Sequence, residues 1–162
     1  MIVKDIQVRA AKGKDAAAMA PNLRAADLAE LQASLGADAD PEAVLKAGIK
    51  YSDDPRTVLV DGVPAAIFGV CDTGESEPTV GCIWLMGTDA IETISMAFLR
   101  GCKAHLPMQQ ASYEILTNFV DSRNTVHIRW LQWLGFSIIR EENDYGAEKR
   151  TFYEFARVSI NV

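Results

Sequence analysis

The side chains best suited to moving protons in this sequence are its two histidines, His105 and His127. An imidazole exchanges a proton near neutral pH. His105 lies near Pro107 at the end of an expected helix, where it complements the helix dipole, and we assign it no catalytic role. His127 and Arg129 are two residues apart, so on a helix they point in different directions. This spacing favours packing or a surface interaction over a joint catalytic role.

Other patterns that carry chemistry are missing. The sequence contains no nucleophile–base pair, no GxxxxGK phosphate loop and no cluster with metal-ligand spacing, so we expect no metal. Its three cysteines, Cys71, Cys82 and Cys102, are far apart and have apolar neighbours. They are typical of small buried residues in a reducing compartment rather than of a disulfide framework.

Length and charge narrow the classes of protein further. The chain has 162 residues, which fits a single domain over residues 1–162. With 16 basic and 22 acidic residues its net charge is −6, which argues against nucleic acid and anionic membranes as partners. The longest apolar stretch, residues 64–71, is far shorter than the ~20 residues that span a bilayer. The N-terminus lacks the basic and apolar regions of a secretion signal.

The first third of the chain predicts one strand and two helices. Residues 2–9 alternate between apolar and polar side chains, as in a half-buried strand. Leu28, Leu31 and Leu35 form one face of a helix that ends at Gly36; Asp27 and Glu30 resemble a capping box at its start. A second, shorter helix opens at Asp40-Pro41 and closes at Gly48.

The rest of the chain alternates strands with two longer helices. Asp61-Gly62 between apolar runs predicts a hairpin of residues 57–60 and 63–71. Further strands are expected at 79–86, 112–120, 136–140 and 151–158, with a turn at 143–146. One helix carries an apolar stripe from Ile91 to Leu106 and stops at Pro107. The other starts after Asp121-Ser122, buries Val126, Trp130 and Leu134, and closes at Gly135.

This order predicts a mixed α/β fold. Three consecutive strands suggest an antiparallel meander, and each later helix crosses over between strands that run parallel. We therefore expect one mixed sheet with helices on both faces, in which strands 79–86 and 112–120 lie parallel at the centre.

The order of elements, and an Asn-led helix that ends in Gly135-Phe136, resemble the GNAT acetyltransferase superfamily. The sequence is most similar to the GNAT-like internal virion protein family of T7-type short-tailed phages. This resemblance covers residues 56–158. It is carried by the arm 61–71, by 82–91, by Asn124-Thr125 with His127-Ile128-Arg129, and by Gly146 with the aromatic strand after it.

The resemblance implies a splayed GNAT-like sheet that holds acetyl-CoA or another acyl-CoA between its two central parallel strands. The pantetheine arm would pair with exposed strand backbone. The diphosphate would rest on the turn Gly87-Thr88-Asp89, where amides and a helix start favour an anion. The implied cofactor-binding residues are Leu85, Met86, Gly87, Thr88, Asn118 and Asn124.

The sequence departs from the superfamily at two places. Asp89 and Glu92 stand where the superfamily has a basic, glycine-rich loop. Leu131 stands where many members have a Tyr that protonates the departing thiolate, and a leucine donates no proton. The catalytic candidates left by the resemblance are Tyr145 as a substitute acid and Glu114 as a base, on the strand 112–120.

Two functions from different classes remain open. The first is a phage-encoded, acyl-CoA-dependent N-acyltransferase with a degenerate diphosphate loop and an amine acceptor that the sequence does not identify. The alternative is a non-catalytic GNAT-like internal virion or assembly protein whose partner is a phage structural protein. Both place the protein in the host cytoplasm during infection, and the second also allows a place in the virion.

Overall fold

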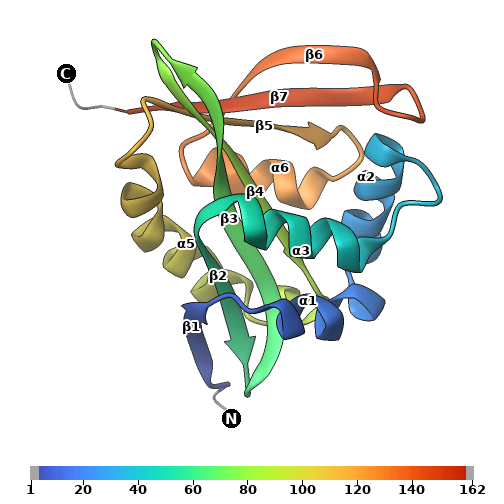
Figure 1. Ribbon diagram of the computed structural model, residues 1–162, viewed down its shortest axis with the longest axis vertical. Coiled ribbons are helices and arrows are strands. Elements are labelled where there is room, and N and C mark those ends of the chain that lie inside the picture. Colours follow the sequence, from blue (N-terminus) through green and yellow to red (C-terminus); the bar gives the residue numbers. More distant parts are fainter. Residues whose placement is uncertain (1–3, 160–162) are drawn as a thin grey trace.

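The protein is built on one seven-stranded mixed sheet, seen in Figure 1 in a computed structural model that describes residues 4–159. The strands lie in the order β1-β2-β3-β4-β5-β7-β6. They are β1 (Ile6–Ala10), β2 (Ser52–Val60), β3 (Val63–Ser76), β4 (Thr79–Gly87), β5 (Ile115–Asp121), β6 (Ser137–Tyr145) and β7 (Arg150–Val158). The helices are α1 (Gly13–Met19), α2 (Ala25–Leu35), α3 (Pro41–Tyr51), α4 (Ala90–Thr93), α5 (Ser95–Gln110) and α6 (Thr125–Trp133), with a short 3-10 turn, η1 (Ala20–Asn22).

The pairing of the strands confirms the expected topology. β2, β3 and β4 form an antiparallel meander, while β4 and β5 are joined by the crossover helix α5 and pair in parallel. β7 inserts between β5 and β6 and is antiparallel to both, so β5 and β6 run in the same direction without pairing. The hairpin turn is also as expected: Asp61 and Gly62 have φ values of 51° and 80°, which match the right-handed twist of the flanking strands.

The two central parallel strands separate along their length. Only three residue pairs join them, from Val80–Ile115 to Cys82–Thr117. No β4–β5 pairing continues beyond these pairs in the described part of the chain. The expected GNAT-like splay is therefore confirmed, and it leaves one side of β4 unpaired from Ile83 onward.

Helices cover both faces of the sheet. On one face, α1 and α3 pack against β3 through a cluster of Ala16, Met19, Leu45 and Ile67. On the other face, α4 and α5 cover β2 and β3, and Phe98 and Ile91 meet Phe68. α6 packs on the same side as α5, where Leu131 shares a cluster with Leu106, Leu116 and Phe155. Because the apolar side chains alternate along β3, this strand supplies core residues to both layers.

Four boundaries or burial patterns differ from the sequence prediction. β1 is a largely exposed edge strand rather than a half-buried one: Val8 is 46% exposed, and Ile2 lies outside the described residues. α3 continues past Gly48 to Tyr51; Gly48 serves packing rather than helix termination, since a Cβ atom there would lie 2.6 Å from the Trp84 ring. α5 continues past Pro107, which lies in its last turn. All three cysteines are only partly buried.

The turn between β6 and β7 lies later than the predicted 143–146, because β6 extends to Tyr145. Gly146 has φ +71°, and a Cβ atom there would lie 2.5 Å from the carbonyl oxygen of Ala33. The backbone amides of Ala147 and Glu148 donate to the carbonyls of Ser34 and Ala33. These bonds satisfy carbonyls at the C-terminal end of α2 and hold that helix beside the splayed end of the sheet.

Candidate functional site

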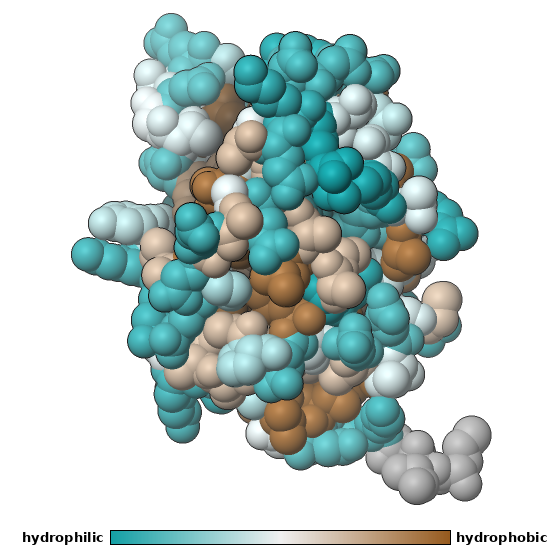
Figure 2. Space-filling model, turned by 90° about the vertical axis from the view of Figure 1, so that its right-hand side faces the viewer, coloured by the Kyte–Doolittle hydropathy of each residue, from teal (hydrophilic) through white to brown (hydrophobic). Residues whose placement is uncertain are grey.

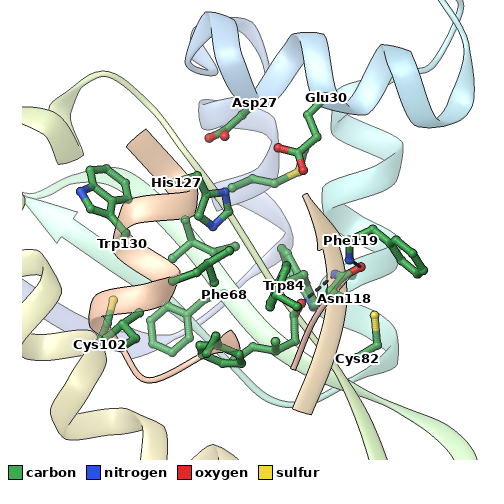
Figure 3. A pocket seen from close by; sticks show the side chains of 18 of the residues that line it. Asp27, Glu30, Phe68, Cys82, Trp84, Cys102, Asn118, Phe119, His127 and Trp130 are labelled. Atoms are coloured by element: carbon green, nitrogen blue, oxygen red, sulfur yellow. Dashed lines mark hydrogen bonds between the residues drawn. The ribbon is translucent and has the colours of Figure 1, made fainter. Parts of the chain in front are cut away.

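A cleft of about 400 Å³ lies where β4 and β5 separate. Its walls come from both faces of the sheet, because α2 and α3 line it together with α5 and α6. Most of the lining is apolar or aromatic, including Phe68, Trp84, Phe119 and Trp130, which Figure 3 shows around the gap. Figure 2 shows apolar side chains gathered within a polar surround on the face toward which α2 and the β6–β7 turn lie. Such a lining suits an apolar ligand or an apolar part of one.

The unpaired edge of β4 is largely satisfied by side chains. Asn118 of β5 donates from Nδ2 to the carbonyl oxygen of Ile83 at 2.7 Å, across the gap. Four residues on, the amide of Gly87 donates to Oδ2 of Asp27 at 2.9 Å. Because backbone groups alternate in direction along a strand, the N–H and C=O of Leu85 point into the same gap. The backbone of Leu85 therefore lies between Ile83 and Gly87, whose backbone groups are already bonded to side chains.

Most amides of the turn after β4 also donate to acceptors within the chain. The amide of Thr88 donates to the carbonyl of Ala65 at 2.8 Å, continuing the β3–β4 ladder. The amide of Ala90 lies 3.4 Å from Oγ1 of Thr88, and those of Ile91 and Glu92 donate to the carbonyls of Thr88 and Asp89, three residues back, at 3.2 and 3.1 Å. Together with Gly87, five amides of this segment already have acceptors inside the chain. This is the segment on which a cofactor diphosphate was expected to rest.

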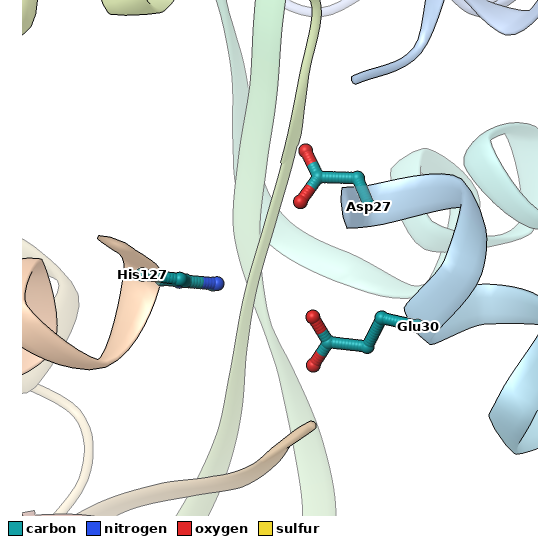
Figure 4. A group of neighbouring side chains, drawn as sticks. All are labelled: Asp27, Glu30 and His127. Atoms are coloured by element: carbon teal, nitrogen blue, oxygen red, sulfur yellow. The ribbon is translucent and has the colours of Figure 1, made fainter. Parts of the chain in front are cut away.

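A polar cluster stands at one end of the apolar cleft. Asp27 and Glu30 extend from α2, and His127 points toward them from α6, as Figure 4 shows. One ligand-type atom from each of the three side chains lies within 4.8 Å of the other two. Asp27 is buried, while Glu30 and His127 are partly buried. The spacing of three residues places both carboxylates on one face of α2.

Arg24 holds the acidic side of this cluster together. Its side chain is 3% exposed, and its guanidinium lies 3.3 Å from Asp27 and 3.1 Å from Glu92. It also lies over the ring of Trp130, 5.2 Å from the centroid. Burial raises the pKa of Asp27 above its ordinary value, while the charge of Arg24 acts in the opposite direction. A buried guanidinium with two acidic partners is a costly arrangement that must be kept fully paired.

Glu30 and His127 are both shifted toward their neutral forms. Burial raises the pKa of Glu30 to about 7, against the hydrogen bonds that it accepts from Nδ2 of Asn124 at 3.0 Å and the amide of Asp121 at 3.1 Å. Burial and the nearby charge of Arg24 lower the pKa of His127 to about 4. The imidazole is therefore neutral at pH 7, and its Nδ1 atom is buried without a hydrogen-bond partner.

Several residues expected at the cofactor site do lie at the cleft. Leu85, Met86 and Asn118 line it, and so does Leu131. Tyr145 lines it too, stacked on Phe119 with 4.7 Å between ring centroids. Gly87 and Thr88 lie in the turn just beyond, bonded as described above.

Asn124 has a role inside the protein. As expected for a residue that starts a helix, it caps α6: its Oδ1 atom accepts from the amide of His127 at 3.4 Å. Its Nδ2 atom is bonded to Glu30. Both polar atoms of this side chain therefore already have partners between α2 and α6.

Glu114 does not belong to this site. It lies at the exposed start of β5, where its carboxylate accepts from the amide of Thr79 at 3.0 Å. That is the paired end of β4 and β5, whereas the cleft lies at their splayed end. The expectation that Glu114 serves as a base for chemistry in the cleft therefore does not hold for this geometry.

The most polar part of the site differs from its prediction from the sequence. Asp27 and Glu30 resemble a capping box in sequence, but α2 begins at Ala25 after Arg24, so both carboxylates lie within the helix. Asp27 caps no amide of its own helix and instead reaches Gly87, 60 residues away. The available signal was an Arg24-Asp27-Glu30 series at helical spacing in an otherwise Ala-rich and Leu-rich segment.

One further finding concerns membranes. Among residues 4–159, no helix combines the length and the apolar character needed to cross a bilayer.

Solved structures share the fold at low sequence identity. An acetyltransferase of the GNAT family from Streptococcus pneumoniae is 15% identical, with a TM-score of 0.64 over 96% of this chain and 100% of its own. The protein yncA of Salmonella typhimurium, described as an acetyltransferase and solved with its cofactor acetyl-CoA, is 13% identical with a TM-score of 0.70 over 97% and 95%. Ribosomal-protein-S5-alanine acetyltransferase from Vibrio fischeri is 13% identical, with a TM-score of 0.69 over 99% and 98%. The chain therefore has the GNAT fold.

At the level of sequence, no curated protein matches the chain. One family model does match, described as "Bacteriophage T7, probable scaffold protein Gp13", over residues 57–143. The match supports the phage part of the expected resemblance, although the description names a scaffold protein rather than an internal virion protein. Because residues 57–143 make up more than half of the chain, the protein belongs to the bacteriophage T7 probable scaffold protein Gp13 family.

Proposed function

We propose that this protein is a non-catalytic, GNAT-fold component of phage assembly, acting through contacts with phage structural proteins. The observation that carries the proposal is the internal bonding of the turn after β4. Five amides from Gly87 to Glu92 already donate to acceptors within the chain, one of them the carboxylate of Asp27. A diphosphate would have to displace these bonds, and each displaced acceptor would lose its partner in the chain.

The charge of this turn also disfavours the binding of a diphosphate. Asp89 is exposed and Glu92 is half exposed, so both present negative charge where a diphosphate would lie. Two like charges near a protein surface, about 4 Å apart, repel by roughly 4 kcal/mol at an effective dielectric of 20. Among residues 4–159, Arg24 is the one guanidinium bonded to this segment; it is 3% exposed and is bonded to Asp27 and Glu92, so it is not free to bind phosphate.

Membership of a family described as a scaffold protein supports the assembly role. In this account the protein is made in the host cytoplasm and associates there with phage structural proteins, either transiently or as part of the virion. The GNAT fold then serves as a stable shell whose surface, rather than its cleft, carries the function.

The test is the fate of the protein during infection. We expect it to co-sediment with assembling particles from infected cells, at a fixed copy number relative to the capsid protein. The matched control is the same chain expressed without the other phage proteins, which should stay in the light fractions. A chain that never joins particles, and that in purified form consumes acetyl-CoA, would overturn the proposal.

A second function is favoured by a different observation. The cleft between the splayed strands persists, Leu85 offers backbone there, and Glu30 has a pKa of about 7, suitable for accepting a proton from an amine. These features support an acyl-CoA-dependent N-acyltransferase with Glu30 as base and Tyr145 as proton donor to the thiolate. For this candidate, Tyr145→Phe should abolish acyl transfer while keeping the aromatic stack on Phe119.

A further inference from the structure

The cluster of Asp27, Glu30 and His127 has features that neither an assembly role nor an acyltransferase role requires. Two carboxylates and an imidazole meet between α2 and α6 with their ligand-type atoms within 4.8 Å of one another. Metal–nitrogen and metal–oxygen bonds of zinc are about 2.0–2.2 Å long, which places neighbouring ligand atoms about 3.4 Å apart around a tetrahedral ion. Small side-chain rotations would bring the three groups to that spacing.

The imidazole of His127 has the properties of a ligand. Its Nδ1 atom is buried and lacks a partner among the residues that the structure describes. A buried, unpaired nitrogen costs free energy unless something binds it.

Both carboxylates are held by donors behind them, as metal-binding carboxylates usually are. Asn124 and the amide of Asp121 orient Glu30, with bonds of 3.0 and 3.1 Å. The amide of Gly87 orients Asp27 at 2.9 Å. A carboxylate oxygen accepts more than one bond, so these contacts fix the two groups without using up their capacity.

The charge of the cluster also favours a dication. Asp27 and Glu92 share the guanidinium of Arg24, and Glu30 lies beside Asp27, so three carboxylates stand near one positive charge, which sums to −2 when all are ionised. Arg24 repels a cation, but both of its ion pairs are with carboxylates, those of Asp27 and Glu92, whose negative charge offsets its own. A divalent ion would bring this sum to zero.

From this geometry we propose that Asp27, Glu30 and His127 form a binding site for a transition-metal dication of the zinc type, with the cleft supplying space for a fourth ligand. One imidazole and two carboxylates suit zinc better than magnesium, which keeps an all-oxygen shell. Bound metal would tie α2 to α6 across the splayed end of the sheet. The inference does not depend on either function proposed above.

The experiment is calorimetric titration of the full-length protein with zinc chloride, after treatment with chelator. We expect one zinc ion per chain, and no binding of magnesium under the same conditions. His127→Gln and Glu30→Gln should each weaken zinc binding by more than about tenfold. Asn124→Ala removes the donor to Glu30 and the cap on the amide of His127 but no ligand, and should weaken zinc binding by about tenfold.

Matched controls separate this site from adventitious binding. His105→Gln removes the other histidine and Glu114→Gln removes a glutamate at the opposite end of β5, so neither should change zinc affinity. Cobalt serves as a second probe: its absorption should lack a thiolate charge-transfer band, which excludes the pair of facing cysteines, Cys71 and Cys82. Circular dichroism of each variant confirms folding; Glu30→Gln, the closest in shape, decides the outcome if His127→Gln does not fold.

Two results would overturn the inference. One is the absence of zinc binding by the wild-type protein at micromolar concentration. The other is zinc binding that survives Glu30→Gln unchanged or that is lost in the variant lacking Cys71 and Cys82.

Discussion

The two halves of the contact between β4 and β5 are satisfied in different ways. In the paired half, from Val80–Ile115 to Cys82–Thr117, the strands bond to each other. In the splayed half, from Ile83 to Gly87, side chains from other elements bond to the edge of β4: Asn118 at one end and Asp27 at the other.

This difference concerns the edge of β4 with which a bound pantetheine arm would pair. A GNAT-type splay exposes strand backbone that a bound pantetheine arm would otherwise satisfy. In this chain Asn118 and Asp27 bond to that backbone at Ile83 and Gly87, and five amides of the segment from Gly87 to Glu92 already donate to acceptors within the chain. The splay is preserved, while the groups that would bind a diphosphate are used internally.

The largest expected effect comes from breaking the ion pair between Arg24 and Asp27, the carboxylate that bonds to the end of β4. Arg24→Met leaves Asp27 buried without its partner, so we expect a loss of about 3–5 kcal/mol in the free energy of unfolding, measured in urea at pH 7. The double variant Arg24→Met with Asp27→Asn should recover part of that loss. Arg140→Met is the control: Arg140 is 56% exposed, and losing its pair with Glu154 should cost under about 1 kcal/mol. Equal losses in Arg24→Met and Arg140→Met would contradict the account.

A second pair of variants compares packing in the two halves. Leu116 is fully buried in the paired half, so Leu116→Ala should cost about 2–5 kcal/mol through lost contacts and a new cavity. Leu85 borders an existing cleft and is only partly buried, so Leu85→Ala should cost less than about 2 kcal/mol. Urea unfolding of both proteins measures the difference. A larger loss for Leu85→Ala would mean that the splayed half is packed as tightly as the paired half.

The third prediction concerns pH. The pKa of Glu30 is about 7 in the folded protein against its ordinary 4.5, so the folded state holds this proton more tightly than the unfolded state. The contribution of Glu30 to the free energy of unfolding is therefore full below pH 4.5 and is lost as the pH rises through 7. Glu30→Gln has no carboxyl group to ionise and so avoids this loss. As the pH rises from 4.5 to 7.5, the free energy of unfolding of the variant should therefore increase relative to that of the wild type by up to about 3 kcal/mol.

His127 titrates in the same window with the opposite sign. Folding lowers the pKa of its imidazole to about 4. Its contribution to the free energy of unfolding is therefore present above pH 6.5 and is lost as the pH falls through 4. The difference between the wild type and Glu30→Gln, measured in the presence of chelator, removes most of this background. A difference that does not change with pH would show that Glu30 is ionised freely in the folded protein.

The sequence predicted features that are decided by local chemistry. The Asp61-Gly62 turn requires positive φ, and Asn124 caps the next helix, so both were visible without the fold. The splay followed from the resemblance to GNAT proteins rather than from any periodicity. For the turn and the helix cap, a few neighbouring residues carry the signal.

Features that depend on distant contacts were not predictable. Gly48 looked like a helix end, yet it lies inside α3, where the Trp84 ring needs the space. Asp27 looked like a cap, yet it bonds to Gly87 at the far end of β4. Glu114 lay on the correct strand but at its wrong end, because the sequence does not indicate where the two central strands separate.

The most direct test of the central claim is a thermal scan of the wild-type protein with millimolar acetyl-CoA or coenzyme A. A ligand at 100 times its dissociation constant stabilises a domain by ~2.7 kcal/mol, which for this size raises the melting midpoint by about 5–11 °C. Salmonella typhimurium yncA, solved with acetyl-CoA, is the positive control. We predict no shift for this protein, and none for the double variant Asp89→Asn with Glu92→Gln, because neutralising those charges leaves the amides of the turn bonded. A shift of 5–11 °C in the wild type would contradict the account.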